Sequence, residues 1–288
     1  MRLHKIRIRA GAEKPFRVLF MADTHLAVAD HAAAGEWQEF SKRRAGYFPH
    51  SIRHLQEATE YASCHGEMMI HGGDLIDFVS TANVLLAQRL LKNADVFFCP
   101  GNHEYSRWAG EKGSDWEACA QSKGQPTALS CNLPTVRKVH GILFATLNDC
   151  DYQVNEAEWE KLRRVMEMGL PVVLVCHVPF FTPKLCESNL QLTRREDAFL
   201  TGLPIAISSK LRYDPALPPS EEWRNSAIQQ KASATTLQFT EWLRQQKPLK
   251  TILTGHCHHF FAEPFSSTAV QYVVGPQFYG EALEITFL

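Results

Sequence analysis

The sequence predicts an α/β fold in which two β-sheets pack together and helices cover them. Three observations predict it. Apolar runs typical of strands alternate with segments of helical periodicity through the first half of the chain. The run at 172–175 is continuously apolar, as strands covered on both faces are. After residue 258 the chain is rich in strand-forming residues, which indicates that a second sheet packs on the first.

The elements of the first half follow one another regularly. Strands are expected where β-branched and aromatic residues run together, and helices where apolar residues recur every three or four positions. In chain order we expect a strand at 16–22, a helix at 51–64, a strand at 68–70, a helix at 81–91 and a strand at 96–99. This alternation is typical of an α/β layer structure.

The second half continues the pattern as far as the irregular stretch 179–233. Asn155 followed by Glu158 resembles a capping box, so a helix is expected to begin there. The other expected elements are strands at 142–147, 172–175, 250–253, 269–273 and 283–287, and a helix at 235–246. The proline-rich stretch 179–233 is interpreted as an insertion or lid within a single domain that spans residues 1–288.

Composition excludes several classes of protein. The chain is 45% hydrophobic and 21% charged, as ordinary globular proteins are, and its net charge of −1 argues against broad binding to a polyanion. We see neither a secretory signal nor an apolar run approaching the ~20 residues of a membrane helix. Eight scattered cysteines without a CxxC pair favour free thiols in a reducing compartment. We therefore expect a cytoplasmic protein that does not bind membranes.

Five short polar motifs each follow a strand-like run. Ligands of an open α/β sheet bind beyond the carboxyl ends of its strands, so we expect the motifs to meet at one edge. Each motif alone is weak evidence, since Gly-Asp and Gly-Asn also make ordinary turns. Together they supply the Asp, Asn and His side chains that hold two neighbouring divalent ions. The motifs are Asp23-Thr24-His25, Gly73-Asp74-Leu75-Ile76-Asp77, Gly101-Asn102-His103-Glu104, Cys176-His177 and Gly255-His256-Cys257-His258.

This set of motifs, in this order, resembles the calcineurin-like metallophosphoesterases. The resemblance runs from the first motif to the last and lacks no core motif. It implies a two-sheet β-sandwich in α-β-β-α layers, with a two-metal site at the carboxyl ends of the strands. It also implies that the bridging ligand is Asp74. The implied ligands are Asp23, His25, Asp74 and His258 for one metal, and Asp74, Asn102, His177 and His256 for the other.

The resemblance also implies catalytic roles. His103 binds no metal but stands beside the phosphate and assists the leaving oxygen, and Asp77 orients His103. A water or hydroxide activated between the two metals is the expected nucleophile. Substrate contacts are expected from Asn102 and His103, and Tyr105 and Arg107 are further candidates because they follow His103 closely.

The ligand types also bear on which metals are bound. Mixed nitrogen and oxygen ligation suits Mn, Fe, Co, Ni or Zn better than Mg or Ca. We expect Mn²⁺, iron or both, with Zn²⁺, Ni²⁺ and Co²⁺ as alternatives. The Ser/Thr protein phosphatases of this superfamily carry an arginine where this chain has Phe78, which disfavours that type of enzyme.

Three functions remain open. The first is hydrolysis of a small phosphate ester, with a diester favoured over a monoester. The second is a nuclease acting on single-stranded or end nucleic acid, against which the neutral net charge argues. The third is a non-catalytic scaffold, which is disfavoured because no ligand motif has been lost. The sequence names neither the substrate nor the oligomeric state.

Overall fold

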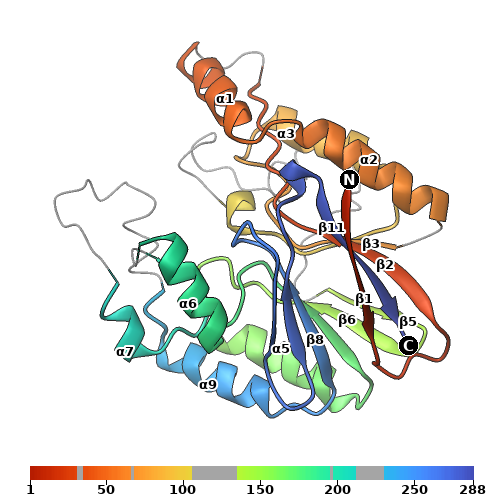
Figure 1. Cartoon of the computed structure of the whole chain (residues 1–288), viewed down its shortest axis with the longest axis vertical. Coiled ribbons are helices and arrows are strands. Elements are labelled where there is room, and N and C mark those ends of the chain that lie inside the picture. The colour runs from red at the N-terminus through yellow and green to blue at the C-terminus, as the bar shows by residue number, and fades with distance from the viewer. Residues whose placement is uncertain (31–34, 66–67, 106–134, 195–196, 212–229) are drawn as a thin grey trace.

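Two β-sheets pack face to face, and helices cover the outer face of each (Figure 1). The computed structural model describes the whole chain except residues 31–34, 66–67, 106–134, 195–196 and 212–229. The layers follow in the order α-β-β-α, because apolar clusters join each sheet to its helices and a third cluster joins the two sheets. The predicted fold class is confirmed.

The first sheet carries three of the motifs. Its five strands lie in the order β1-β11-β2-β3-β4, and β2, β3 and β4 run parallel to one another. Strand β11 is antiparallel to β2 and parallel to β1. Helices α2 (Ser51–His65) and α3 (Thr81–Leu91) pack on the outer face. The strands are β1 (Arg2–Ile8), β11 (Glu281–Phe287), β2 (Phe16–Met21), β3 (Met68–His71) and β4 (Val96–Phe98).

The second sheet carries the other two motifs. Its order is β5-β6-β7-β8-β10-β9, and the four central strands run parallel. Helices α5 (Glu156–Glu167) and α9 (Ala234–Arg244) cover its outer face. The strands are β5 (Val136–Val139), β6 (Ile142–Thr146), β7 (Val172–Val175), β8 (Leu249–Thr254), β10 (Val270–Val273) and β9 (Phe261–Pro264).

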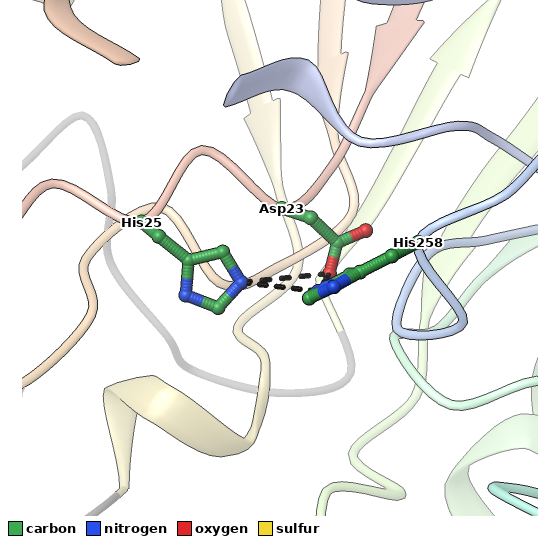
Figure 2. Close-up of side chains that lie close together, drawn as sticks. All are labelled: Asp23, His25 and His258. Carbon is green, nitrogen blue, oxygen red and sulfur yellow. Dashed lines mark hydrogen bonds and ion pairs between the residues drawn. The ribbon is translucent and has the colours of Figure 1, made fainter. Parts of the chain in front are cut away.

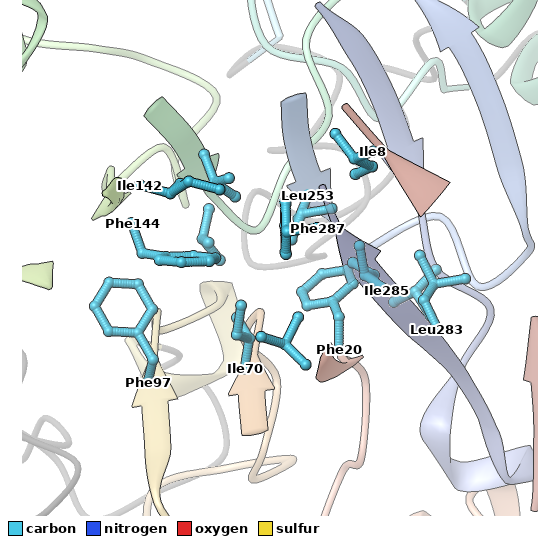
Figure 3. Packing of buried hydrophobic residues seen from close by; sticks show 14 of the residues in the cluster. Ile8, Phe20, Ile70, Phe97, Ile142, Phe144, Leu253, Leu283, Ile285 and Phe287 are labelled. Atoms are coloured by element: carbon cyan, nitrogen blue, oxygen red, sulfur yellow. The ribbon is translucent and has the colours of Figure 1, made fainter. Parts of the chain in front are cut away.

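The space between the sheets is filled by buried apolar side chains. Phe20, Ile70 and Phe97 of the first sheet face Phe144 and Leu253 of the second (Figure 3). All five side chains are at most 1% exposed. Burial of each contributes about 1.5–3 kcal/mol, so this cluster fixes how the two sheets, and the loops that follow their strands, lie against each other.

Most predicted elements are confirmed, including the helix that begins after Asn155, whose side chain accepts a bond from the amide of Glu158. The sequence did not predict β1, β5 or the helix α1 (Gly35–Tyr47), which buries only Ser41 and so shows no apolar stripe. The six cysteines among the described residues are free thiols, as predicted.

The stretch 179–233 is more regular than predicted. It contains helix α6 (Pro183–Leu192) and the short helix α7 (Ile205–Ser208). Proline is compatible with the first helical position, where its missing amide costs nothing, so Pro183 begins α6 rather than preventing it. The role of this stretch as an insertion or lid stays a prediction, and 195–196 and 212–229 lie outside the described residues. None of the described helices has the length and apolar character that a bilayer crossing requires.

Candidate metal centre

The five motifs meet at one edge where the two sheets adjoin. Asp23 follows β2, Asp74 follows β3, and Asn102 and His103 lie in the single turn η1 (Asn102–Glu104) after β4. His177 follows β7 in the second sheet, and the last motif follows β8. Main-chain bonds join neighbouring loops, as the amide of Asp23 donates to the Gly73 carbonyl at 3.0 Å. The predicted gathering of the motifs is confirmed.

A first cluster consists of Asp23, His25 and His258 (Figure 2). The Nε2 atoms of the two histidines are 3.3 Å apart. Oδ1 of Asp23 lies 3.4 Å from Nε2 of His258 and 4.0 Å from Nε2 of His25. One carboxylate oxygen and two imidazole nitrogens therefore point into the same small volume.

A second cluster consists of Asp74, His177 and His256. Nε2 of His177 lies 3.1 Å from Oδ2 of Asp74 and 3.3 Å from Nδ1 of His256. The same Oδ2 atom of Asp74 is 3.6 Å from Nε2 of His25 in the first cluster. Asp74 therefore lies between the two clusters.

The donor set fits divalent ions. Within each cluster the candidate ligand atoms lie within 4.8 Å of one another. Asp23 and Asp74 are almost fully buried, at 0% and 2% exposed, and buried carboxylates are costly unless cations compensate them. Carboxylate oxygens mixed with imidazole nitrogens suit first-row divalent metals. Asn102, the seventh predicted ligand, begins η1 at the same edge.

Burial and neighbouring charges shift the pKa values of the candidate ligands, and these shifts determine which ligands carry a proton. Burial alone would raise the pKa of Asp74, but the neighbouring His177 and His103 outweigh burial and hold that pKa well below its usual value. Burial, together with the charge of His177, lowers the pKa of His256 to about 3, so its ring is neutral. Burial opposes charge on His177 itself, yet Asp74 raises its pKa to about 10. A metal ion would therefore displace a proton from His177.

The predicted ligands hold strained backbone conformations. Asp23, His25, Asp74, His256 and His258 all have positive φ, between 53° and 69°. A non-glycine residue in this region costs about 1–3 kcal/mol, which the surrounding structure must offset. Hydrogen bonds within the loops supply part of that compensation. Strain concentrated on five predicted ligands is typical of a functional site.

Asp77 lies at Nδ1 of His103, and its closest contact there is made by the main chain. Nδ1 of His103 lies 2.6 Å from the main-chain carbonyl oxygen of Asp77, whereas the Asp77 carboxylate is 3.4 Å away. The carboxylate instead bonds Nδ1 of His25 at 3.2 Å and receives both Nε and Nη2 of Arg44. Asp77 thus contacts His103 mainly through its backbone, which fixes the tautomer and leaves Nε2 of His103 facing Asp74 at 3.9 Å.

Of the two further candidates for substrate contact, the structure describes only Tyr105. Tyr105 directly follows η1 and is half-buried, and its contact with substrate stays a prediction. Arg107 lies outside the described residues.

Sequence reasoning missed several residues that touch the site. Oη of Tyr152 lies 2.8 Å from Nε2 of His256, the ring of Phe48 stacks on His25, and Arg44 binds Asp77. The carboxylate of Glu104 accepts bonds from three main-chain amides, those of Asp74, Ile76 and Gly101. Only Glu104 gave a signal, because it completes the Gly-Asn-His-Glu motif. The other three come from segments without any motif.

Gly73 is required beside the second cluster. It has a φ of +100°, and an added Cβ would lie 2.6 Å from both the amide nitrogen of Gly101 and Nδ1 of His177. Gly73→Ala is expected to lower the free energy of unfolding by more than the ~1–2 kcal/mol that left-handed backbone alone costs. Urea denaturation measures this. Gly169→Ala is the control, because Gly169 has a φ of +69° but open space around it. Equal losses in the two variants would contradict the steric argument.

A buried carboxyl beside the second cluster predicts a pH effect on stability. Burial raises the pKa of Asp149 to about 7, although Val178 and Thr201 donate hydrogen bonds to it. The folded protein therefore holds this proton above the pH at which the unfolded chain releases it. In metal-free protein, the contribution of Asp149 to stability is expected to fall as pH rises from about 4 to about 7.

The Asp149→Asn variant tests that expectation, because an amide cannot titrate. Urea denaturation across this pH range should show a shallower decline for the variant than for the wild type. Parallel curves for the two proteins would contradict the raised pKa of Asp149.

Known proteins resemble this chain in sequence pattern and in fold. The sequence model of the calcineurin-like phosphoesterases matches residues 16–271. No curated protein matches the chain. A dimetal phosphatase from Danio rerio has a TM-score of 0.50 and 14% identity, over 91% of this chain and 88% of its own. A calcineurin-like phosphoesterase from Bacillus subtilis has a TM-score of 0.44 and 9% identity, over 92% and 82%.

The likeness to the Danio rerio phosphatase, at 14% identity, shows a shared fold, and the family assignment rests on the sequence match. That match includes strands of both sheets and all seven predicted ligands, from Asp23 to His258, and leaves out β1 and β11. The chain therefore belongs to the calcineurin-like phosphoesterase family.

Proposed function

We propose that this protein hydrolyses small phosphate esters at a centre that holds two divalent ions. The observation that carries the proposal is the position of Asp74, whose Oδ2 lies 3.1 Å from Nε2 of His177 and 3.6 Å from Nε2 of His25. A carboxylate so placed can serve two ions at once. The proposed ligands are Asp23, His25, Asp74 and His258 for one ion, and Asp74, Asn102, His177 and His256 for the other.

The bound ions and the protein side chains have different roles in the proposed reaction. When bound, the two ions would lower the pKa of a water molecule and neutralise charge on the phosphoryl oxygens. In its doubly protonated form, His103 donates the Nε2 proton to the leaving oxygen, while its Nδ1 proton stays bonded to the Asp77 carbonyl. The His103 side chain is 11% exposed, so it is largely shielded from bulk water. Asn102, next to His103, is the proposed phosphate contact, with Tyr105 beside them.

Manganese, iron or both are the proposed ions, because the site mixes imidazole nitrogen with carboxylate oxygen. Metal analysis of the purified protein tests this directly. Two equivalents of a first-row divalent metal per chain are expected. A protein loaded only with Mg²⁺ or Ca²⁺ would contradict the ligand argument.

Hydrolysis is tested with metal-stripped protein that is reconstituted with Mn²⁺. We expect turnover of p-nitrophenyl phosphate, bis-p-nitrophenyl phosphate or both, and none after chelation. The ratio of the two rates decides between a monoesterase and the diesterase that we favour. Protein with two bound ions and no turnover of either ester would contradict the proposed function.

A nuclease is the alternative function, and the net charge of −1 gives it no electrostatic support. Digestion of single-stranded DNA in the same reconstituted sample decides between them. DNA cleavage faster than cleavage of the small esters would replace the proposal with the alternative. A non-catalytic scaffold is excluded if either assay shows turnover.

A further inference from the structure

An arginine from a peripheral helix reaches the buried carboxylate beside the metal clusters. Helix α1 projects away from the two sheets at one end of the molecule (Figure 1). Arg44, near its end, donates from Nε to Oδ2 of Asp77 at 2.6 Å and from Nη2 to Oδ1 at 2.7 Å. This bidentate geometry fixes the plane of a carboxylate more firmly than a single bond does.

Asp77 passes this constraint to two histidines of the site. Its Oδ1 is 3.2 Å from Nδ1 of His25, which leaves Nε2 of His25 facing the first cluster. Its main-chain carbonyl holds Nδ1 of His103. The Asp77 side chain is 0% exposed, so its charge depends on partners within the protein.

The same segment also holds His25 from a second direction. The ring of Phe48 stacks on the ring of His25, with centroids 4.2 Å apart and planes 8° apart. The guanidinium of Arg44 lies over Phe48, 5.1 Å from its centroid. Arg44 therefore contacts both of the groups that orient His25, which are Phe48 on the face of the ring and Asp77 at Nδ1.

We propose that Arg44 is a positioning residue for the first metal, acting through Asp77 and His25. The proposal rests on the proposed two-metal function. Without the guanidinium, Asp77 would lose the bond that fixes its plane, and His25 would lose its fixed orientation. The second cluster should be affected less, because His177 and His256 bond the Gly72 carbonyl and Tyr152 rather than Asp77.

The first test is binding of Mn²⁺ to metal-stripped protein, which needs no turnover. Arg44→Met keeps an unbranched aliphatic side chain and removes the guanidinium, and with it the contacts to both Asp77 and Phe48. We expect the affinity of the first Mn²⁺ site to fall by about 10–100-fold, which is the usual effect of removing a residue that hydrogen-bonds to a metal ligand. The affinity of the second site should not change. Calorimetric titration resolves the two sites. Arg44→Lys should restore part of the lost affinity, because its ammonium can still reach Asp77.

Arg43→Met is the matched control. Arg43 is the preceding residue of the same helix, is exposed, and packs its guanidinium over Phe40 at 5.4 Å. The Arg43→Met substitution removes one positive charge from the same helix, as Arg44→Met does, but it leaves the contacts of Asp77 unchanged. Wild-type binding of both Mn²⁺ ions is expected for this variant. Weakening equal to that of Arg44→Met would overturn the proposal, because net charge would then explain the effect.

Steady-state kinetics separate positioning from substrate binding. With Mn²⁺ subsaturating for the weakened site, Arg44→Met should lower kcat for bis-p-nitrophenyl phosphate and leave KM within about twofold. A raised KM with unchanged kcat would overturn the proposal in favour of a substrate contact. Equal weakening of both Mn²⁺ sites with a lowered melting temperature would overturn it in favour of general support of the fold. A wild-type protein that binds two Mn²⁺ ions but cleaves no ester would refute the proposed function and leave the metal-binding test intact.

Discussion

Asp74→Asn is expected to abolish tight binding of both metal ions and to lower kcat by more than about 100-fold. Removing a group that merely supports a ligand typically costs 10–100-fold, and Asp74 is itself the candidate ligand shared by both clusters. The substitution keeps the shape of the side chain and removes its charge. An amide oxygen can still accept the bond that Oδ1 receives from the amide of His103 at 2.9 Å, so the local fold should survive.

Metal content and turnover are measured together for this variant. Asp95→Asn is the control, since Asp95 is an exposed carboxylate that pairs with Arg137 at 2.7 Å. It should bind two ions and hydrolyse esters as the wild type does. An Asp74→Asn protein that retained two ions and normal kcat would show that the centre does not depend on a shared carboxylate.

His103→Ala is expected to lower kcat without changing metal content. A positioned proton donor contributes about 10²–10⁴-fold, so a loss of that size is expected for esters with alkoxide leaving groups. Esters of p-nitrophenol should lose much less, because that leaving group needs little protonation. Nε2 of His103 faces Asp74, and its Nδ1 is held by the Asp77 carbonyl, so the ring is placed for this single task.

The comparison of two leaving groups is the decisive measurement. His65→Ala is the control, because His65 is a solvent-exposed imidazole at the end of α2. If the His103→Ala variant lost the same factor on both esters, proton donation would not be its role. Loss of a metal ion on removal of His103 would instead identify it as a ligand, since its ring nitrogens lie close to ligand atoms of His25 and Asp74.

The sequence predicted the position of the motif residues that directly follow strands. Asp23, Asp74 and His177 follow apolar runs, and parallel strands bring such positions to one edge. Local pattern was enough there, because strand periodicity and sheet topology together determine position. The same reasoning placed the core between the sheets, since Val172–Val175 is apolar at every position.

Pattern was not enough where contacts come from the backbone or from distant segments. The Asp77 carbonyl that holds His103 is invisible in a sequence, because every residue has a carbonyl. Arg44 and Tyr152 reach the site from segments without motifs, and α1 lacks an apolar stripe. Only the folded chain shows that an arginine from this helix serves the carboxylate of a motif that lies beyond the next helix.

The position of β11 has a consequence for how the site is assembled in time. This strand lies between β1 and β2, so the strand that leads to Asp23 gains its second neighbour only when residues 281–287 are available. On a ribosome, β2 cannot gain this neighbour until residues 281–287 have emerged. Contacts between segments so distant in sequence are formed slowly. The candidate metal centre should therefore mature only after residues 281–287 have been made, and nascent chains arrested before residue 281 should not capture metal with native affinity.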